Sequence, residues 1–470
     1  MTPLPDGEKI IEALAQNVLA TSLDDLDEDT VEWAKTRILD VIGWVVVGAR
    51  AGGNAELVSI LKKWGGAPEA SVLVYGYKLP APSAALANCV MARSFDYGPV
   101  EPRAGSQGLP GHLSETTIPT ALAVGELVEA NGGEILAALI AGEDVACRVL
   151  AAGGFDFGDG WDSVGTVNAI GATAIAGRLL GLSPEQLRNA FGIVLNQLSG
   201  SFQDYWEAGM TFKLLQGLSA RNGILSAELA RAGWTGPKDP LLGRYGYYRL
   251  FVNRRVDAEV LTRDLGRAYY TDSVIKPYPS CRITHGAIDC ALAIARQHPI
   301  VAGEVEAVRV YVAPQVLEHF AARPFVPKSF LHARAAFSFQ YTVASALARG
   351  RLKPADFTEE AIRDPQVAWL AGRVKLAGSP GVEGLGAEVE VRLKDGRVFR
   401  EAVAVPRGDR WASPLSAEEI RNKFLENLSF KGLDIEIGYQ ILQLCQNFEH
   451  LKNPAVLCEL LSSRPPLRGS

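Results

Sequence analysis

Hydrophobic residues recur every three or four positions through most of the first ~270 residues. In residues 7–20, for example, Ile10, Leu14 and Val18 fall on one side of a helical wheel. Such a period is typical of helices that bury one face against a core. Further helices of this kind are predicted over residues 28–48, 83–94, 117–130, 133–152, 166–182 and 214–232. The first part of the chain is therefore expected to form a large helical unit.

The hydrophobic pattern changes after about residue 270. Residues 305–312, VEAVRVYV, alternate between apolar and polar side chains, which predicts a strand. Residues 388–393 and 398–403 alternate in the same way around Asp395-Gly396, a pair typical of a tight hairpin turn. Helices are predicted between these strands, near residues 283–297 and 334–349. This part of the chain is therefore expected to be α+β.

The end of the chain returns to a helical pattern. Ser416 and Glu419 have the spacing of a capping box, which predicts a helix start, and another helix is predicted over residues 433–446. We expect this tail to pack on the helical unit. The predicted fold class is thus mainly α with an α+β second domain. The helical domain would comprise residues 1–271 and 412–470, and the α+β domain residues 272–411.

Charge and composition narrow the possible partners. The chain has 47 Lys and Arg against 53 Asp and Glu and no long basic run, which disfavours nucleic-acid binding. The apolar run at residues 41–47 is far shorter than the roughly 20 residues that span a membrane, and the first residues lack a secretory signal. None of the six cysteines forms a C-x-x-C pair, a pattern typical of reduced thiols. We expect a cytoplasmic protein with no nucleic-acid or membrane partner.

The sequence carries no metal or nucleotide motif. The six histidines form neither H-x-x-x-H nor H-E-x-x-H pairs, and no Cys/His cluster has ligand spacing. There is no G-x-x-x-x-G-K-[ST] segment and no G-x-G-x-x-G segment after a strand. We therefore predict no metal and no cofactor, so that side chains alone would supply the chemistry.

Polar side chains gather in two places within the predicted helical domain. Asp96 and His112 lie at the two ends of a long Gly/Pro-rich loop, and folding of this loop could bring them together. Asp162 precedes the small-residue helix predicted over 166–182, where backbone N–H groups can hold an anion. In a plainer interpretation, Asp96 and Asp162 are ordinary helix caps and His112 is a surface histidine.

Two further segments carry candidate chemistry. Lys213 stands among Met, Phe and Leu residues, where desolvation would lower its pKa and suit it to proton transfer or carboxylate binding. The alternative is a surface lysine whose stem covers apolar groups. Lys276, Cys281, Arg282 and His285 lie in a proline-stiffened segment at the predicted domain junction, where small-molecule sites are common. No partner motif supports a nucleophilic Cys281.

These segments, in this order, resemble the MmgE/PrpD family. The similarity extends over nearly the whole chain. It is carried by LDVIGWVVVGA (39–49), GHLSETTIPTALAVGE (111–126), VGTVNAIGATAIAGRLLGLSPEQLRNAFGI (164–193), TFKLLQGLSARNGILSAELARAGWTGP (211–237), KPYPSCRITHGAIDCAL (276–292) and AAFSFQYTVASAL (335–347).

The resemblance implies a fold and an activity. It implies a helical domain built from both chain ends, an inserted α+β domain, a homodimer and a cofactor-free site between the domains. The slightly positive mean hydropathy, +0.07, also favours a dimer. The family includes 2-methylcitrate dehydratases, cis-aconitate decarboxylases and iminodisuccinate epimerases. By motif match, Asp96, His112, Lys213 and Lys276 take the positions of the family's site aspartate, histidine and lysines.

The sequence departs from the family pattern within these motifs. The D-x-D-D-T-H segment is reduced to one aspartate, Asp96, followed by Tyr97. Asp162, Gln216 and Cys281 stand where family members carry histidines. The missing histidines argue against cis-aconitate decarboxylation and weaken the case for 2-methylcitrate.

The family reactions share proton transfer at a carbon beside a carboxylate. His112 is the predicted base with Asp96 orienting it, and Asp162 is a second acid or base. Cations must stabilise the charge that develops on the acceptor oxygen, and Lys213, Lys276 and Arg282 are predicted for that role. The predicted substrate-binding residues are Lys276, Arg282, Cys281, Gln216, Tyr97 and His285.

We therefore expect a cofactor-independent hydro-lyase, similar to a 2-methylcitrate dehydratase, that acts on a small hydroxy-polycarboxylate or related acid. An epimerase or isomerase of a small acid, similar to iminodisuccinate epimerase, uses the same first step and is the alternative. A family member that binds a small molecule without catalysis is a second alternative, because so much of the D-x-D-D-T-H segment is missing.

Overall fold

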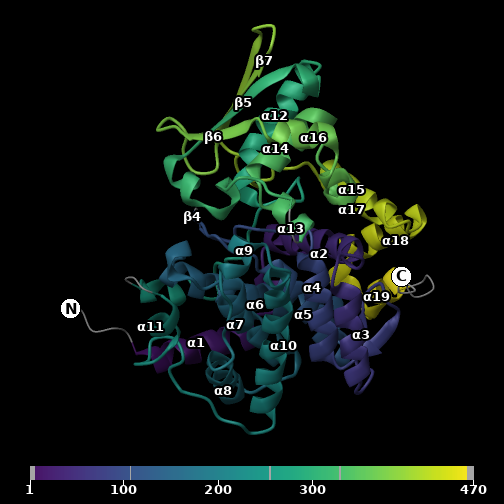
Figure 1. Ribbon diagram of the computed structural model, residues 1–470. Coiled ribbons are helices and arrows are strands. Elements are labelled where there is room, and N and C mark those ends of the chain that lie inside the picture. Colours follow the sequence, from purple (N-terminus) through teal and green to yellow (C-terminus); the bar gives the residue numbers. More distant parts are fainter. Residues whose placement is uncertain (1–5, 106, 253–255, 328–329, 463–470) are drawn as a thin grey trace.

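The computed structural model describes residues 6–105, 107–252, 256–327 and 330–462. A large helical part carries a smaller part that contains a four-stranded sheet (Figure 1). The predicted fold class, mainly α with an α+β second part, is confirmed. The domain boundaries at 271/272 and 411/412 stay a prediction.

The helical part is held together by close crossings of small residues. Its helices are α1 (Gly7–Ala20), α2 (Glu28–Gly48), α3 (Asn54–Trp64), α4 (Ala81–Arg93), α5 (Ser114–Leu127), α6 (Gly132–Gly153), α7 (Ser163–Leu179), α8 (Pro184–Leu195), α9 (Gln203–Glu207), α10 (Thr211–Arg231) and α11 (Tyr247–Phe251). Helix α10 packs against α7 and α4. A Cβ added at Gly223 would lie 2.6 Å from the Cβ of Ala172, and one at Gly217 would lie 2.6 Å from the carbonyl oxygen of Leu86. Glycine at both positions lets the three helices approach closely.

A capping box fixes the start of α8. The hydroxyl of Ser183 accepts a hydrogen bond from the Gln186 backbone N–H, and the side-chain oxygen of Gln186 accepts one from the Ser183 backbone N–H. Helix α8 therefore begins with a complete capping box. Two short two-stranded sheets lie outside the helices, β1 (Ala70–Val72) with β2 (Tyr77–Leu79) and β3 (Arg103–Ala104) with β4 (Gln107–Gly108). The second of these lies in the long loop between α4 and α5.

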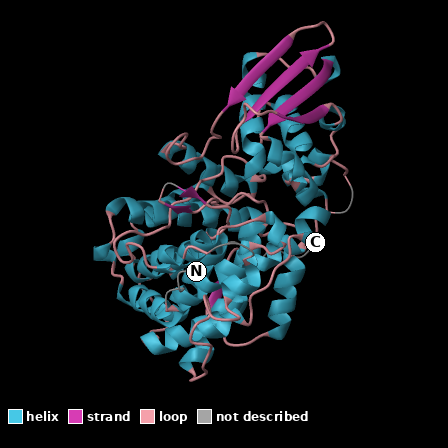
Figure 2. Cartoon of the chain, turned by 90° about the vertical axis from the view of Figure 1, so that its left-hand side faces the viewer, coloured by secondary structure: helices cyan, strands magenta, loops and turns pink. Residues whose placement is uncertain are grey.

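The smaller part packs helices against one face of its sheet (Figure 2). The helices are α12 (His285–Gln297), α13 (Leu331–Ala336), α14 (Phe339–Arg349), α15 (Glu359–Ile362) and α16 (Pro365–Ala371). The strands are β5 (Val305–Val312), β6 (Val374–Gly378), β7 (Ala387–Leu393) and β8 (Val398–Val403), in the order β6-β5-β7-β8. The predicted hairpin of β7 and β8 is confirmed by its antiparallel register. Strand β6 runs parallel to β5 and was not predicted.

The tail helices α17 (Ala417–Phe430), α18 (Ile435–Gln446) and α19 (Ala455–Ser462) return to the helical part (Figure 1). Lys423 of α17 pairs with Asp40 of α2 at 2.7 Å, and both side chains are buried. Both ends of the described chain therefore contribute to the same helical part. No helix among the described residues is both long enough and apolar enough to cross a membrane.

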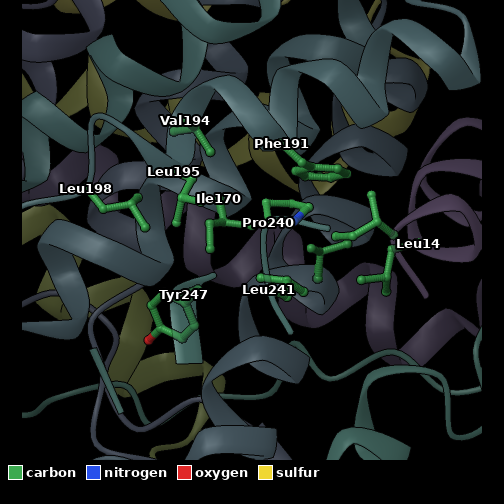
Figure 3. A pocket seen from close by; sticks show the side chains of 11 residues that line it. Leu14, Ile170, Phe191, Val194, Leu195, Leu198, Pro240, Leu241 and Tyr247 are labelled. Atoms are coloured by element: carbon green, nitrogen blue, oxygen red, sulfur yellow. The ribbon is translucent and has the colours of Figure 1, made fainter. Parts of the chain in front are cut away.

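The core of the helical part leaves a small gap between α1, α7 and α8. Its volume is about 10 Å³, and Leu14, Ile170 and Phe191 are among the side chains that line it (Figure 3). A gap of this size holds about one water molecule, and its apolar lining offers few partners for one. It is a packing gap and not a ligand site.

Candidate active site

A cavity of about 360 Å³ lies between the helical part and the smaller α+β part. Both parts contribute side chains to it. The helical part supplies Arg93, Asp96, Val100, Glu101, His112, Phe155, Asp162, Ser163, Phe202 and Tyr205. The α+β part supplies Cys281, Arg282, Ile283, His319, Phe320, Phe337 and Leu385. The loop between α4 and α5 adds Gly108, Pro110 and Gly111.

Asp96 is held at the centre of a buried group of charges. It follows the end of α4 with a φ of 50°, a left-handed conformation that aspartate tolerates better than most residues. Its carboxylate contacts the Arg93 guanidinium and lies 3.1 Å from Nζ of Lys276, which also donates to the Asp96 carbonyl at 2.8 Å. Burial would raise the pKa of Asp96, but Arg93, Lys276 and His112 outweigh it and lower the pKa below its usual value. Asp96 is therefore an anion at neutral pH.

His112 is fixed through its backbone and turns its ring toward these charges. Its carbonyl accepts hydrogen bonds from Asn168 at 2.6 Å and from Gln216 at 3.2 Å. Nδ1 lies 3.3 Å from Nη1 of Arg93, and Nε2 lies 3.8 Å from Oδ1 of Asp96. Burial, helped by Arg93 and Lys276, lowers the pKa of His112 well below 6.5. The imidazole is therefore neutral, and 18% of the side chain stays exposed where it lines the cavity.

Glu115 is a site residue that the sequence analysis missed. It lies in the first turn of α5 and is fully buried, with Oε1 3.3 Å from Nδ1 of His112 and 3.8 Å from Nη1 of Arg93. Burial raises the pKa of Glu115 to about 7, and the positive charges of Arg93 and Lys276 only partly oppose it. Its carboxyl group thus titrates near neutral pH beside the candidate base.

Asp162 caps α7 and also lines the cavity. Its Oδ1 accepts a hydrogen bond from the Val164 backbone at 3.0 Å, so the helix-cap interpretation holds. Its Oδ2 accepts a second bond from the hydroxyl of Tyr205 at 2.9 Å. Burial raises the pKa of Asp162. The same carboxyl group can therefore serve both as a cap and as an acid that faces the cavity.

Arg93 and Tyr205 complete this polar wall and were also missed. Arg93 ends the apolar helix α4 and is 1% exposed, and one of its nitrogens lies 3.3 Å from the hydroxyl of Tyr205. A signal did exist for Arg93, because it is the single charged residue of α4 and precedes Asp96 by three positions. No comparable signal marks Tyr205, since its partner Asp162 is 43 positions away in the chain.

Arg282 and Cys281 reach the cavity from the α+β part. Arg282 pairs with Glu101 at 3.2 Å and donates to the carbonyl groups of Arg407 at 2.6 Å and Pro406 at 3.1 Å. It therefore joins the loop after α4 to the segment after β8. Burial raises the pKa of the Cys281 thiol to about 12, so at neutral pH it is a thiol and a poor nucleophile.

The remaining predicted residues do not line this cavity. Nζ of Lys213 donates to the Gly52 carbonyl at 2.6 Å and to Oδ1 of Asn54 at 2.7 Å, and burial lowers its pKa to about 8. Lys276 lies behind Asp96 and is fully buried. Both lysines thus contact oxygen atoms of the protein. Neither lies where it would contact a substrate in the cavity.

Tyr97, Gln216 and His285 also have partners within the protein. The hydroxyl of Tyr97 donates to the Pro277 carbonyl at 2.6 Å. Nε2 of His285 lies 3.2 Å from the Ser280 carbonyl, and burial lowers the pKa of this histidine well below 6.5. Gln216 supports the backbone of His112, so it acts on the site indirectly. Within the described part of the chain, no group of His, Cys, Asp and Glu is arranged to hold a metal ion.

Comparison with known proteins gives matches along the whole chain. Residues 12–258 match the model of the MmgE/PrpD N-terminal domain, and residues 278–434 match that of the C-terminal domain. Human cis-aconitate decarboxylase is 27% identical over 481 residues, covering 98% of this chain and 96% of the relative. The cis-aconitate decarboxylase of Aspergillus terreus is 25% identical over 465 residues, with 93% of each chain covered. A protein of Aspergillus oryzae described as cis-aconitate decarboxylase-like is 24% identical, with 97% of each chain covered.

Proposed function

The chain belongs to the MmgE/PrpD family, and we propose that it is a hydro-lyase that removes a proton from the carbon beside a carboxylate of a small hydroxy-polycarboxylate or related acid. The relatives described as cis-aconitate decarboxylases support an enzyme of the lyase type. The finer assignment, dehydration, rests on the groups that line the cavity.

One observation carries the proposal: Nδ1 of His112 lies 3.3 Å from Oε1 of Glu115. When Glu115 is ionised, its negative charge stabilises the imidazolium that forms when His112 accepts a proton. The lowered pKa of His112 keeps the ring neutral before reaction. Glu115 and Asp96 then stabilise the imidazolium that forms. His112 is therefore the base, and Glu115 is a positioning residue.

Dehydration also needs an acid for the leaving group. Asp162 lines the cavity with a raised pKa and is bonded to the Tyr205 hydroxyl at 2.9 Å. In the proposed step His112 takes the α-proton, and the electrons of that C–H bond form the carbon–carbon double bond. The bond from the β-carbon to its hydroxyl breaks, and the hydroxyl leaves as water with a proton from Asp162. Arg93 and Arg282 line the same cavity and stabilise charge on the substrate carboxylate.

Epimerisation is the second candidate, because Asp162 could return a proton to the α-carbon instead of to a leaving group. His112 and Asp162 come from different elements of the cavity wall, which supports two distinct proton carriers. A binding protein without catalysis stays the third possibility. Incubation in deuterium oxide with β-hydroxy acids separates them. A hydro-lyase gives an unsaturated product that absorbs in the ultraviolet, an epimerase gives only deuterated substrate, and a binding protein gives neither.

The variant His112→Asn tests the role of the base. We expect turnover to fall at least about 100-fold, because general-base catalysis is typically of that size. The melting temperature should stay close to that of the wild type, since the His112 backbone keeps its partners. His450→Asn is the matched control, because that side chain is 78% exposed on the surface. Unchanged turnover in His112→Asn contradicts the proposed function.

We also propose that the protein is a homodimer of the cytoplasm. Family membership and the mean hydropathy of +0.07 support a dimer. Light scattering on the purified protein tests it, and a mass equal to the single chain of 50.4 kDa contradicts it.

A further inference from the structure

We propose that Glu101 occupies the position of one substrate carboxylate, and that the substrate displaces it from Arg282 on entering the cavity. The inference rests on the proposed function, because it states how the acid of that site binds. It follows from the place of the Arg282–Glu101 ion pair between two hollows of the molecule, and from the unequal way in which its two side chains are held.

The ion pair lies where the cavity meets a second hollow. This groove has a volume of about 660 Å³, and its lining includes the exposed residues Gly381 and Glu383. Four residues line both the groove and the cavity, namely Glu101, Gly108, Arg282 and Leu385. They therefore form the boundary between the two hollows. A molecule that enters the cavity from the groove meets the ion pair on its way.

Arg282 is the fixed member of the pair. Its Nη1 donates to the Arg407 carbonyl at 2.6 Å and its Nη2 to the Pro406 carbonyl at 3.1 Å. Nε donates to the Glu101 carboxylate at 3.2 Å, and the Arg282 side chain is 6% exposed. The two carbonyl groups keep the guanidinium oriented while its carboxylate partner changes. A guanidinium held in this way suits the planar geometry of an incoming carboxylate.

Glu101 is the member of the pair that can move. Its side chain is 25% exposed and also lines the groove. Its backbone N–H donates to the Gly111 carbonyl at 3.1 Å, so the loop can stay in place while the side chain turns. A partly exposed ion pair contributes little to stability. Rotation of Glu101 into the solvent of the groove therefore costs little.

The polar wall of the cavity can compensate a further carboxylate. Asp96 pairs with two cations, Arg93 and the buried Lys276, so this group has more positive than negative charge. Burial raises the pKa values of Glu115 and Asp162, which reduces the negative charge of their carboxyl groups. An acid with two carboxylates thus finds positive charge at Arg93 as well as at the ion pair.

A cluster of aromatic rings lines the same cavity and excludes water from it. Tyr205 stacks on Phe320 with centroids 5.3 Å apart and meets Phe337 edge-on, also at 5.3 Å. Phe202 lies 5.1 Å from Tyr205. Attraction between opposite charges is stronger where water is excluded. The attraction of Arg282 for a substrate carboxylate inside the cavity therefore exceeds its attraction for the partly exposed Glu101.

These contacts lead to an exchange of partners without any covalent change. One carboxylate of the acid takes the place of Glu101 on Nε of Arg282, a second lies near Arg93, and Glu101 turns into the groove. The acid displaces Glu101 because it makes contacts at two places, whereas Glu101 makes one. Glu101 is thus an internal competitor that keeps Arg282 compensated and lowers the affinity of the cavity for acids.

Calorimetry with tricarballylate tests the inference. This acid has three carboxylates and no hydroxyl group, so it binds without being dehydrated. We expect Glu101→Gln to bind it at least about threefold more tightly than the wild type, because no ion pair has to be broken. Glu383→Gln is the matched control, since it removes a carboxylate from the groove but not from the cavity, and it should change the affinity less than about twofold. Unchanged or weaker binding by Glu101→Gln, an equal gain in the control, or no binding to any form overturns the inference.

A double variant separates exchange from simple repulsion. Arg282→Gln should bind tricarballylate at least about tenfold more weakly than the wild type, and adding Glu101→Gln to it should bring no gain. A gain from Glu101→Gln in both backgrounds would mean that Glu101 only repels the ligand, which overturns the inference. Arg282→Lys, which lacks the planar fork, replaces Arg282→Gln if that variant does not fold.

Failure of the proposed function looks different from failure of this inference. Tricarballylate would then bind to the variants in the expected order, but citrate, which carries a hydroxyl group, would give neither an unsaturated acid nor deuterated citrate in deuterium oxide.

Discussion

Nδ1 of His112 and Oε1 of Glu115 lie 3.3 Å apart in a buried pocket of charge, with Arg93 within 4 Å of both. Burial moves the pKa values of the two groups in opposite directions, down for the histidine and up to about 7 for the glutamate. The carboxyl group of Glu115 therefore titrates near neutral pH beside a neutral imidazole. This relationship makes the activity and the stability of the protein depend on the same carboxyl group.

Activity should rise with pH through about 7. Below the pKa of Glu115 its carboxyl group is neutral and does not stabilise the imidazolium that forms at His112. Above it, the carboxylate stabilises that positive charge, so His112 is a better base. We expect kcat/KM of the wild type to increase across this range, and Glu115→Gln to lose the rise. Glu185→Gln is the control, because that side chain is 79% exposed. An identical pH profile in Glu115→Gln would show that Glu115 does not govern the base.

Glu115 should also make stability fall as pH rises from about 4.5 to 7. The folded carboxyl group keeps its proton up to a pKa of about 7, whereas the unfolded one loses it near the ordinary glutamate pKa of 4.5. The folded state therefore binds more protons in this window, and the free energy of unfolding decreases as pH increases. The cost is at most roughly 3 kcal/mol for a shift of this size. Urea unfolding at pH 5 and pH 8 should show a larger loss for the wild type than for Glu115→Gln, and equal losses would contradict the buried, titrating carboxyl group.

Asp96→Asn should destabilise the fold strongly. The Asp96 carboxylate compensates both Arg93 and Lys276, and its removal leaves two buried cations together. Breaking a buried charge pair costs about 3 to 5 kcal/mol. Asp395→Asn removes the exposed partner of Arg397 on a hairpin turn and should cost less than about 1 kcal/mol. Urea denaturation of both variants measures the difference, and similar costs would mean that the buried group is not held by charge.

Tyr205→Phe should lower turnover more than stability. The change keeps the ring in its aromatic cluster but removes the hydroxyl that donates to Asp162 and lies 3.3 Å from Arg93. Loss of this hydrogen bond raises the pKa of Asp162 further and leaves the carboxyl group less firmly oriented. We expect kcat to fall about tenfold, with a loss of stability of about 1 kcal/mol. Steady-state kinetics and a melting curve on the same preparation measure the two effects. A fall in stability without a change in kcat would assign the hydroxyl a structural role.

Much of the fold could be predicted because its signals are local. Helix α1 and strand β5 have the bounds that the hydrophobic period predicted, and the Asp-Gly turn placed the β7–β8 hairpin. Strand β6 was missed because its five residues are too short to show a period. Its identity as a strand comes from pairing with β5, more than 60 positions earlier in the chain.

The sequence likewise predicted some residues of the candidate site and missed others. Motif order along the chain selected Asp96, His112 and Asp162, all of which line the cavity. It also selected Lys213, but a motif cannot show that Nζ would be directed at Gly52 and Asn54. Glu115 was passed over because a glutamate in the first turn of a helix ordinarily stabilises that helix from the surface. Only its burial beside His112 changes its pKa and its role.

The sequence by itself determined the helices, the hairpin and the membership of a family, because each depends on residues close together or on their order. The tertiary structure alone decided which charges are paired and which rings meet. Arg282 pairs with Glu101, which is 181 positions away in the chain, and Tyr205 stacks on Phe320 from the other part of the molecule. Such contacts depend on how distant segments pack. The electrostatic energy of each charged group therefore depends on which partners the packing brings within a few ångströms of it.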